Sequence, residues 1–169
     1  PVHGILGHIV SQVELSAWVD SDNPNLVELC SAGASAFATI STPDSYNYQT
    51  AAEVSGLMSI VFSVKTPHDA RIALGEDETH LGDKYEIVIG GDLNQRSLIR
   101  NLTQGDLSED TVVSTDAPFV SDRLPKYFWL SWSFGKLRVG RETTVGQNQF
   151  LITDLDTDRQ INFLLVSTG

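Results

Sequence analysis

Hydrophobic and polar residues alternate in short runs over most of the chain after residue 35, which is the pattern of strands with one buried face. Three runs show it clearly: "MSIVFSV" at 58–64, "DARIAL" at 69–74 and "YEIVI" at 85–89. In the second run, Asp69 and Arg71 are expected to point outward. The positions expected to face a common core are Met58, Ile60, Phe62 and Val64, then Ala70, Ile72 and Leu74, then Tyr85, Ile87 and Ile89.

Two further runs are richer in hydrophobic residues. "YFWLSW" at 127–132 is apolar on both faces, as expected for a central strand that is covered on each side. "QINFLLV" at 160–166 is predicted to form the last strand, with Ile161, Phe163 and Leu165 on one face.

Clusters of Gly, Pro, Asp and Asn separate these runs, for example "TPHD" at 66–69 and "DLDTD" at 154–158. In "SFGKLRV" at 133–139, Gly135 is expected to supply the positive φ of a tight hairpin. Turn signals at this density, between short strands, predict an all-β fold: an antiparallel β-sandwich of jelly-roll type.

The first 35 residues are less regular. We favour a strand from about residue 11, preceded by a short irregular or helical arm and followed by a turn at "DSDNPN". No repeat or low-complexity segment divides the chain. Residues 1–169 are therefore predicted to form a single domain, in which residues 1–35 are an N-terminal extension packed on the same sandwich.

The pair Gly90-Gly91 follows a predicted strand, where a nucleotide-binding loop would also lie. Such a loop needs a further glycine and the start of a helix, whereas "DLNQRSLIR" follows here. In "VELCSAGASA" at 27–36, Cys30, Ala32 and Ala34 occupy the positions that a methyltransferase-type cofactor site fills with glycine. We therefore interpret the glycine pair as the turn of a hairpin.

The chain is acidic: 11 Lys and Arg residues against 22 Asp and Glu residues give 169 residues a net charge of −11. Such a surface repels nucleic acid and anionic lipid, and it suits cations, neutral sugars or basic proteins. No apolar run reaches the length needed to span a bilayer, so neither nucleic acid binding nor membrane insertion is predicted.

Metal-binding patterns are weak. The four histidines, His3, His8, His68 and His80, are not spaced as zinc ligands on a helix. Calcium is left open because carboxylates gather in "DLDTD", although the glycine and glutamate of an EF-hand loop are replaced by Arg159 and Leu165. We predict no metal site and no cofactor.

Two other features bear on context. The one cysteine, Cys30, excludes a disulfide within the monomer and leaves a buried thiol or an intersubunit disulfide open. "NLT" at Asn101–Thr103 is an N-glycosylation sequon, which is a common triplet. The tryptophans and tyrosines are interpreted mostly as core residues, although an exposed ring beside polar groups is how a neutral sugar is held.

The segments "FSVKTPHDARIAL", "YEIVIGGDLNQRSLIR", "YFWLSWSFGKLRVGRE" and "INFLLVSTG" together resemble the farnesoic acid O-methyltransferase domain family, from about Tyr46 to the C-terminus. The family typically has an aromatic residue after the double glycine, whereas this chain has Asp92. The family's name implies methyl transfer from S-adenosylmethionine to a sesquiterpene acid. Similar domains also occur beside modules thought to recognise carbohydrate, so the resemblance implies lectin-like recognition as well.

We predict a non-catalytic, secreted recognition domain that binds carbohydrate or a glycoprotein. The candidate ligand-binding residues lie at strand ends and turns: His68, Asp69, Arg71, Asp92, Asn94 and Arg96. Their carboxylate, amide and guanidinium groups suit hydrogen bonding to sugar hydroxyls. Two alternatives stay open: a methyltransferase acting on an isoprenoid acid, and a structural subunit that forms a homo-oligomer through strand edges or Cys30.

Overall fold

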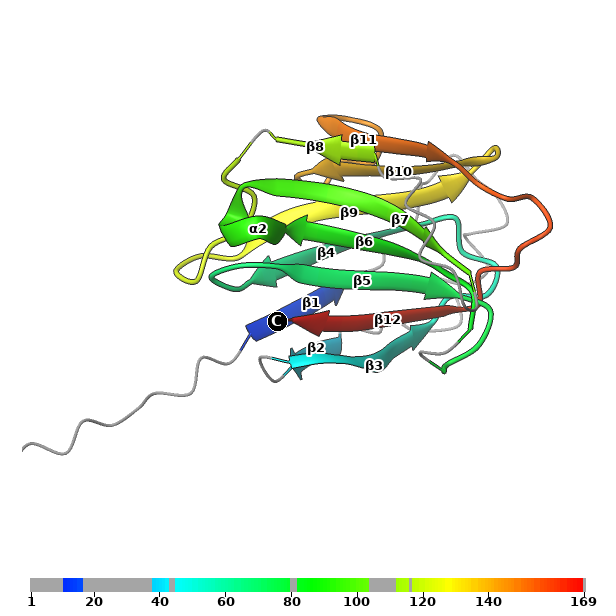
Figure 1. The fold of residues 1–169 in the computed structure, drawn as a ribbon, viewed down its shortest axis with the longest axis horizontal. Coiled ribbons are helices and arrows are strands. Elements are labelled where there is room, and N and C mark those ends of the chain that lie inside the picture. The colour runs from blue at the N-terminus through cyan, green and yellow to red at the C-terminus, as the bar shows by residue number, and fades with distance from the viewer. Residues whose placement is uncertain are drawn as a thin grey trace, which may run out of the picture.

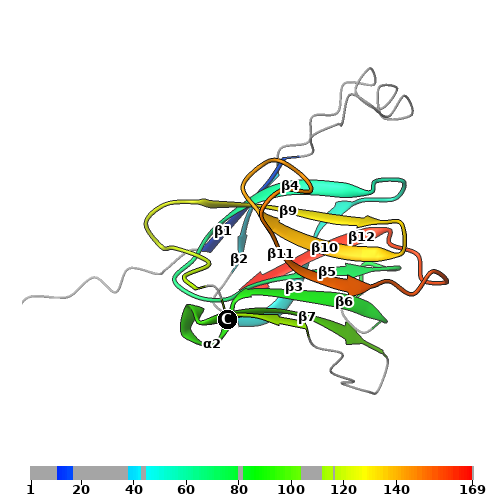
Figure 2. The same ribbon diagram turned by 90° about the horizontal axis from the view of Figure 1, so that it is seen from above.

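The computed structural model describes residues 11–16, 38–42, 45–79, 82–103, 112–115 and 117–168. Within these ranges the chain forms two antiparallel sheets packed face to face (Figures 1 and 2). The predicted fold class, an all-β sandwich of jelly-roll type, is therefore confirmed. No helix in the described part of the chain is long and apolar enough to cross a membrane.

The strands enter the two sheets in consecutive blocks along the chain. The six-stranded sheet has the order β11-β10-β9-β4-β1-β2, and its strands are β1 (Ser11–Ser16), β2 (Ala38–Thr42), β4 (Ser59–Lys65), β9 (Lys126–Ser133), β10 (Lys136–Arg141) and β11 (Gln149–Asp154). The five-stranded sheet has the order β12-β5-β6-β7-β8, and its strands are β5 (Ala70–Gly75), β6 (Lys84–Gly90), β7 (Arg96–Leu102), β8 (Val112–Ser114) and β12 (Phe163–Thr168). β3 (Ser45–Glu53) lies alongside β12, and α2 (Gly91–Asn94) is a single turn between β6 and β7 (Figure 1).

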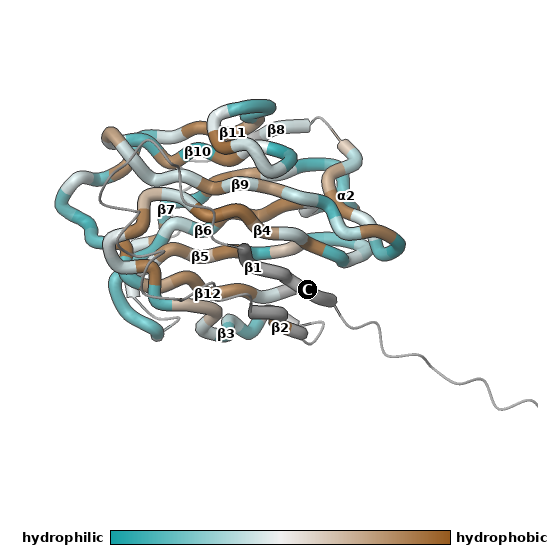
Figure 3. Tube along the Cα trace, turned by 180° about the vertical axis from the view of Figure 1, so that it is seen from behind, coloured by the Kyte–Doolittle hydropathy of each residue, from teal (hydrophilic) through white to brown (hydrophobic). Residues whose placement is uncertain are grey.

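The core lies between the sheets, and most predicted core positions are confirmed. The buried residues contributed by β4, β5 and β6 are Ile60, Phe62, Val64, Ala70, Ile72, Leu74, Tyr85, Ile87 and Ile89. Hydrophobic residues follow the strands and hydrophilic residues the connections between them (Figure 3). Met58 is a wrong prediction: it precedes β4 and is 49% exposed.

The pairing of the last strand identifies its inward face, which the sequence analysis did not specify. Leu164 and Val166 face the core, because they pair with Leu74 and Ile72 of β5. Leu165 therefore points to the other face of the sheet, where it is nevertheless buried. With apolar residues on both faces, the hydrophobic pattern alone does not identify the inward one.

β9 has the central position predicted for it, between β10 and β4. The predicted hairpin after it is confirmed, with Phe134 and Gly135 at φ 53° and 66°. β1 agrees with the strand expected from residue 11. The arm before it, the turn at 20–25, Cys30 and the packing of most of residues 1–35 lie outside the described residues.

The connections gather at opposite ends of the sandwich. We call one the loop end, which contains the described connections 66–69, 91–95, 117–125 and 142–148. We call the other the acidic end, which contains the connections 54–58, 76–79, 82–83, 134–135 and 155–162.

Candidate functional site

All six predicted site residues lie at the loop end or on the sheet face next to it. The antiparallel pairing of β5 with β6 sets Ala70 opposite Ile89, so the start of one strand lies beside the end of the other. His68 and Asp69 are thereby brought to the same end as the turn that holds Asp92, Asn94 and Arg96.

The first group is joined by hydrogen bonds. His68 Nδ1 lies 3.0 Å from Asp69 Oδ1, and Arg71 Nη2 donates to Asp69 Oδ2 at 2.7 Å. Arg71 also lies 3.9 Å from a carboxylate oxygen of Glu86. The Asp69 carboxylate therefore already orients two neighbouring side chains of the protein.

The second group forms a left-handed turn. Asp92, Leu93 and Asn94 have φ values of 55°, 57° and 65°, a conformation that costs L-residues about 1–2 kcal/mol each. The Asn94 side chain holds the turn against segment 117–125: Oδ1 accepts the N–H groups of Phe119 and Val120 at 2.9 and 3.0 Å, and Nδ2 donates to the Val120 carbonyl at 2.9 Å.

The rest of this turn is more open. Asp92 and Arg96 have exposed side chains that form a loose ion pair, with 3.8 Å between Arg96 Nε and Asp92 Oδ2. At such distances and exposures an ion pair contributes little to stability. Both groups are therefore free to exchange this contact for one with a ligand.

The glycine pair is a turn, as predicted. Gly90 has φ 76°, and a Cβ there would lie 2.7 Å from Val120 Cγ2, so only glycine fits. Its N–H donates to Ser97 Oγ at 3.1 Å. Because the backbone N–H is already bonded and the space above it is filled by Val120, this turn does not fit the phosphate or adenosyl group of a cofactor.

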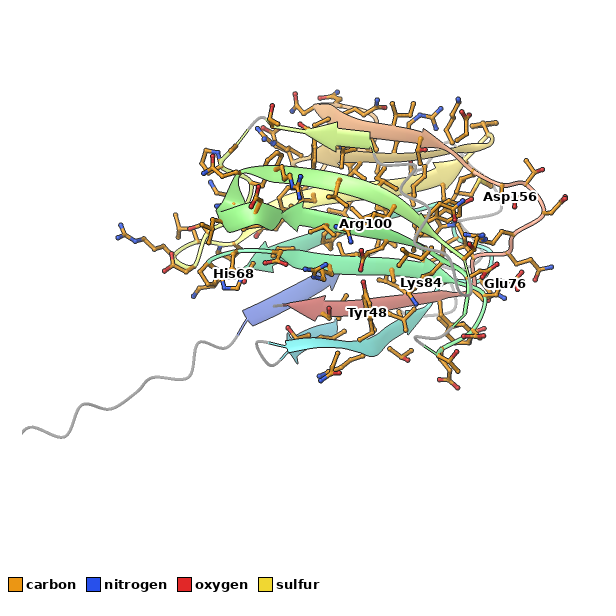
Figure 4. All side chains as sticks on the ribbon, viewed as in Figure 1. Tyr48, His68, Glu76, Lys84, Arg100 and Asp156 are labelled. Carbon is orange, nitrogen blue, oxygen red and sulfur yellow. The ribbon has the colours of Figure 1, made fainter. Side chains whose placement is uncertain are left out.

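A polar cluster crosses the outward face of the five-stranded sheet, and sequence reasoning missed most of it. At its centre Glu86 is fully buried, accepts a hydrogen bond from Tyr48 Oη, and lies 3.6 Å from Arg100 Nη1. Burial lowers the pKa of the nearby Lys84, while the charge of Glu86 opposes this shift. Figure 4 shows Tyr48, Lys84 and Arg100 along this face. The β6–β7 turn sets Glu86 opposite Arg100 on the neighbouring strand. This pairing of opposite charges across the predicted hairpin was the feature of the sequence that could have revealed the cluster.

A hollow of about 420 Å³ opens at the loop end. Its volume lies in the range of about 300–1,000 Å³ that is typical of ligand sites. The lining residues are Pro118, Phe119, Pro125, Lys126, Tyr127, Phe128, Arg141, Glu142 and Thr143. Tyr127 is 50% exposed, whereas Trp129, Trp132 and Tyr85 are buried. The interpretation of the aromatic residues as mostly core thus holds for those three, and Tyr127 is an exception.

Two of the charged groups of this hollow, Arg141 and Glu142, are held in place. The Arg141 guanidinium lies 5.0 Å from the ring centre of Phe119 and 5.5 Å from that of Phe150, within the range of cation–π contacts. Glu142 accepts a hydrogen bond from Asn148 Nδ2 at 3.0 Å. The hollow therefore presents an open aromatic ring beside positioned hydrogen-bonding groups.

The carboxylates of "DLDTD" and the asparagine of the sequon form contacts within the protein. Asp154 pairs with Lys136, and Asp156 accepts the N–H of Asp158 at 3.1 Å. Among the described residues, no group of three or more His, Cys, Asp or Glu side chains is arranged to hold a metal ion. In the sequon, Asn101 accepts a hydrogen bond from Arg159 Nη1 at 2.7 Å.

Comparison with known proteins places the chain in a wider context. A model of the family described as "Farnesoic acid 0-methyl transferase" matches residues 42–169, close to the predicted start at Tyr46. No curated protein matches the chain. Among solved structures, the chain is similar to "a prokaryotic beta-1,3-1,4-glucanase (lichenase) derived from a mouse hindgut metagenome", at 7% identity and a TM-score of 0.40. The match covers 92% of this chain and 64% of the glucanase, which is less than two thirds of it.

Proposed function

The chain belongs to the farnesoic acid O-methyltransferase family, and from this membership and the geometry of the loop end we propose that it is a non-catalytic domain that binds carbohydrate. Its site is the hollow beside Tyr127. We extend the proposal to a secreted protein whose partners are oligosaccharides or glycoproteins.

The observation that carries the proposal is the half-exposed ring of Tyr127 in a hollow that also contains Lys126, Arg141 and Glu142. A sugar ring has an apolar C–H face and polar hydroxyl groups at its rim. An aromatic ring covers the first, and charged or amide groups bond the second. The six predicted residues surround the same end, where Asp92 and Arg96 are available as additional contacts.

Binding to an array of neutral and acidic oligosaccharides tests this function, followed by calorimetric titration of the best binder. Tyr127→Ala is expected to weaken the affinity roughly tenfold to a hundredfold, because it removes the stacking surface. Phe134→Ala is the matched control: Phe134 is 94% exposed but lies in the β9–β10 turn at the acidic end. Equal losses in the two variants would contradict the proposed site.

The family description motivates a second measurement. Titration with S-adenosylmethionine separates the carbohydrate function from methyl transfer, because a methyltransferase must bind this cofactor. Binding of S-adenosylmethionine that is abolished by a large substitution in the Gly90 turn would favour the methyltransferase alternative. Sugar binding without cofactor binding is the result that we expect.

A further inference from the structure

Charge is distributed unevenly between the two ends of the sandwich. The connections of the acidic end and the strand residues beside them contain eight described acids and three bases: Glu53, Glu76, Asp77, Glu78, Asp83, Asp154, Asp156 and Asp158, with Lys84, Lys136 and Arg159. The loop end contains four described acids and five bases: Asp69, Asp92, Asp122 and Glu142, with Lys65, Arg96, Arg123, Lys126 and Arg141. Figure 4 shows Glu76 and Asp156 at one end and His68 at the other.

The hollow has two of the chain's 11 basic residues in its wall. The planar Arg141 guanidinium is fixed by two aromatic rings, so little side-chain freedom is lost when it binds a ligand. Lys126 is exposed, and no ion pair is recorded for it within the described ranges. The one acid of the wall, Glu142, already accepts a hydrogen bond from Asn148.

We propose that the hollow selects a sugar bearing a carboxylate, such as a uronic acid residue, over its neutral counterpart. This inference rests on the proposed carbohydrate function and names its ligand class. Arg141 and Lys126 hold the carboxylate, while Tyr127 covers the C–H face of the ring. Hydrogen bonds between charged partners are about twice as strong as neutral ones, so the carboxylate contributes selectivity.

The net charge of −11 is compatible with this selection because surface charges act over a limited distance. At physiological salt, interactions beyond about 8 Å are largely screened. A ligand at the loop end is therefore affected mainly by the groups nearest to it, among which the described bases outnumber the described acids by five to four. The acids at the opposite end disfavour binding of an anion there and so direct it to the hollow.

The test compares an oligogalacturonate with the same oligosaccharide after its carboxyl groups have been reduced to alcohols. Calorimetric titration is expected to give roughly tenfold to a hundredfold tighter binding of the acid form, with a preference that decreases as salt is raised. Lys126→Gln should reduce this preference, and Lys126→Glu should abolish it. Lys136→Gln is the control, because Lys136 begins a strand of the same sheet at the acidic end.

The outcomes separate the two proposals. Equal binding of both oligosaccharides, lost in Tyr127→Ala, would overturn the selection of acidic sugars and leave the carbohydrate function standing. Binding of neither, or binding that Tyr127→Ala does not weaken, would overturn the carbohydrate function at this site. An acid preference that is unchanged in Lys126→Glu would place the anion site elsewhere and would also overturn the inference. Circular dichroism of each variant confirms that it is folded.

Discussion

Gly140 provides the sharpest test of how the wall of the hollow is built. It lies opposite Trp129 in the pairing of β10 with β9, and the indole ring lies across it. A Cβ at Gly140 would be 2.2 Å from Cε2 of that indole. The indole N–H donates to the Gln147 carbonyl at 2.7 Å and so holds the connection that also carries Glu142. Gly140→Ala must therefore displace Trp129.

The expected cost follows from two terms. Forcing additional volume into a packed site costs about 1–3 kcal/mol, and a buried donor that loses its partner costs about 1–3 kcal/mol more. Alanine also reduces the conformational entropy of the unfolded chain, which offsets this cost by about 0.4–1 kcal/mol. We therefore expect Gly140→Ala to lower the free energy of unfolding by about 2–5 kcal/mol.

Urea titration measures this loss, and near-ultraviolet circular dichroism reports the displacement of the fully buried Trp129. Gly75→Ala is the matched control, because a Cβ there meets its nearest atoms at an ordinary 3.5 Å. That variant should stay within about 1 kcal/mol of the original protein. If Gly140→Ala retained both the original stability and the original aromatic spectrum, the contact between Trp129 and Gly140 would be refuted.

Three further outcomes are expected. Asn94→Ala should lower the free energy of unfolding by about 2–4 kcal/mol, because it removes the hydrogen bonds to segment 117–125. Asn94→Gly should lower it by less, because glycine relieves the left-handed backbone strain. Urea titration measures both values, and the reverse order would contradict this reasoning. Arg159→Met should lower the free energy of unfolding by about 1–3 kcal/mol, because it removes the contact with Tyr85 and the hydrogen bond to Asn101. A double-mutant cycle with Asn101→Ala should show a coupling energy above about 0.5 kcal/mol. Because burial lowers the pKa of Lys84, the folded state releases the Lys84 proton at a lower pH than the unfolded state does. The free energy of unfolding should therefore rise with pH from the folded pKa towards 10.5. Lys84→Met should remove that rise in urea titrations carried out at a series of pH values.

The sequence predicted the fold well where one face of a strand was polar. In β6, the alternation of Lys84, Glu86 and Val88 with Tyr85 and Ile87 identified the core face correctly. In β12 the alternation does not identify the core face, because Leu164 and Leu165 are equally hydrophobic and their direction depends on pairing with β5. Periodicity decides a face only when the two faces differ in polarity.

The site was less predictable because its residues come from separate connections. Asn94 was selected for its hydrogen-bonding chemistry, and the structure uses that chemistry to bind segment 117–125. Tyr127 was grouped with the other aromatic residues, which were interpreted mostly as core residues. Its exposure is a consequence of its place near the start of β9, where the strand emerges at the loop end. Neither outcome is encoded in a local pattern.

The glycine pair connects these findings. Because Gly90 has no side chain, Val120 packs directly on the β6–β7 turn, and Asn94 then fixes the backbone of Phe119 beside it. Phe119 in turn lies under the Arg141 guanidinium in the wall of the hollow. The turn therefore helps to place a distant cation in the wall of the hollow. If the hollow binds a ligand as we propose, this glycine is needed although it does not touch the ligand.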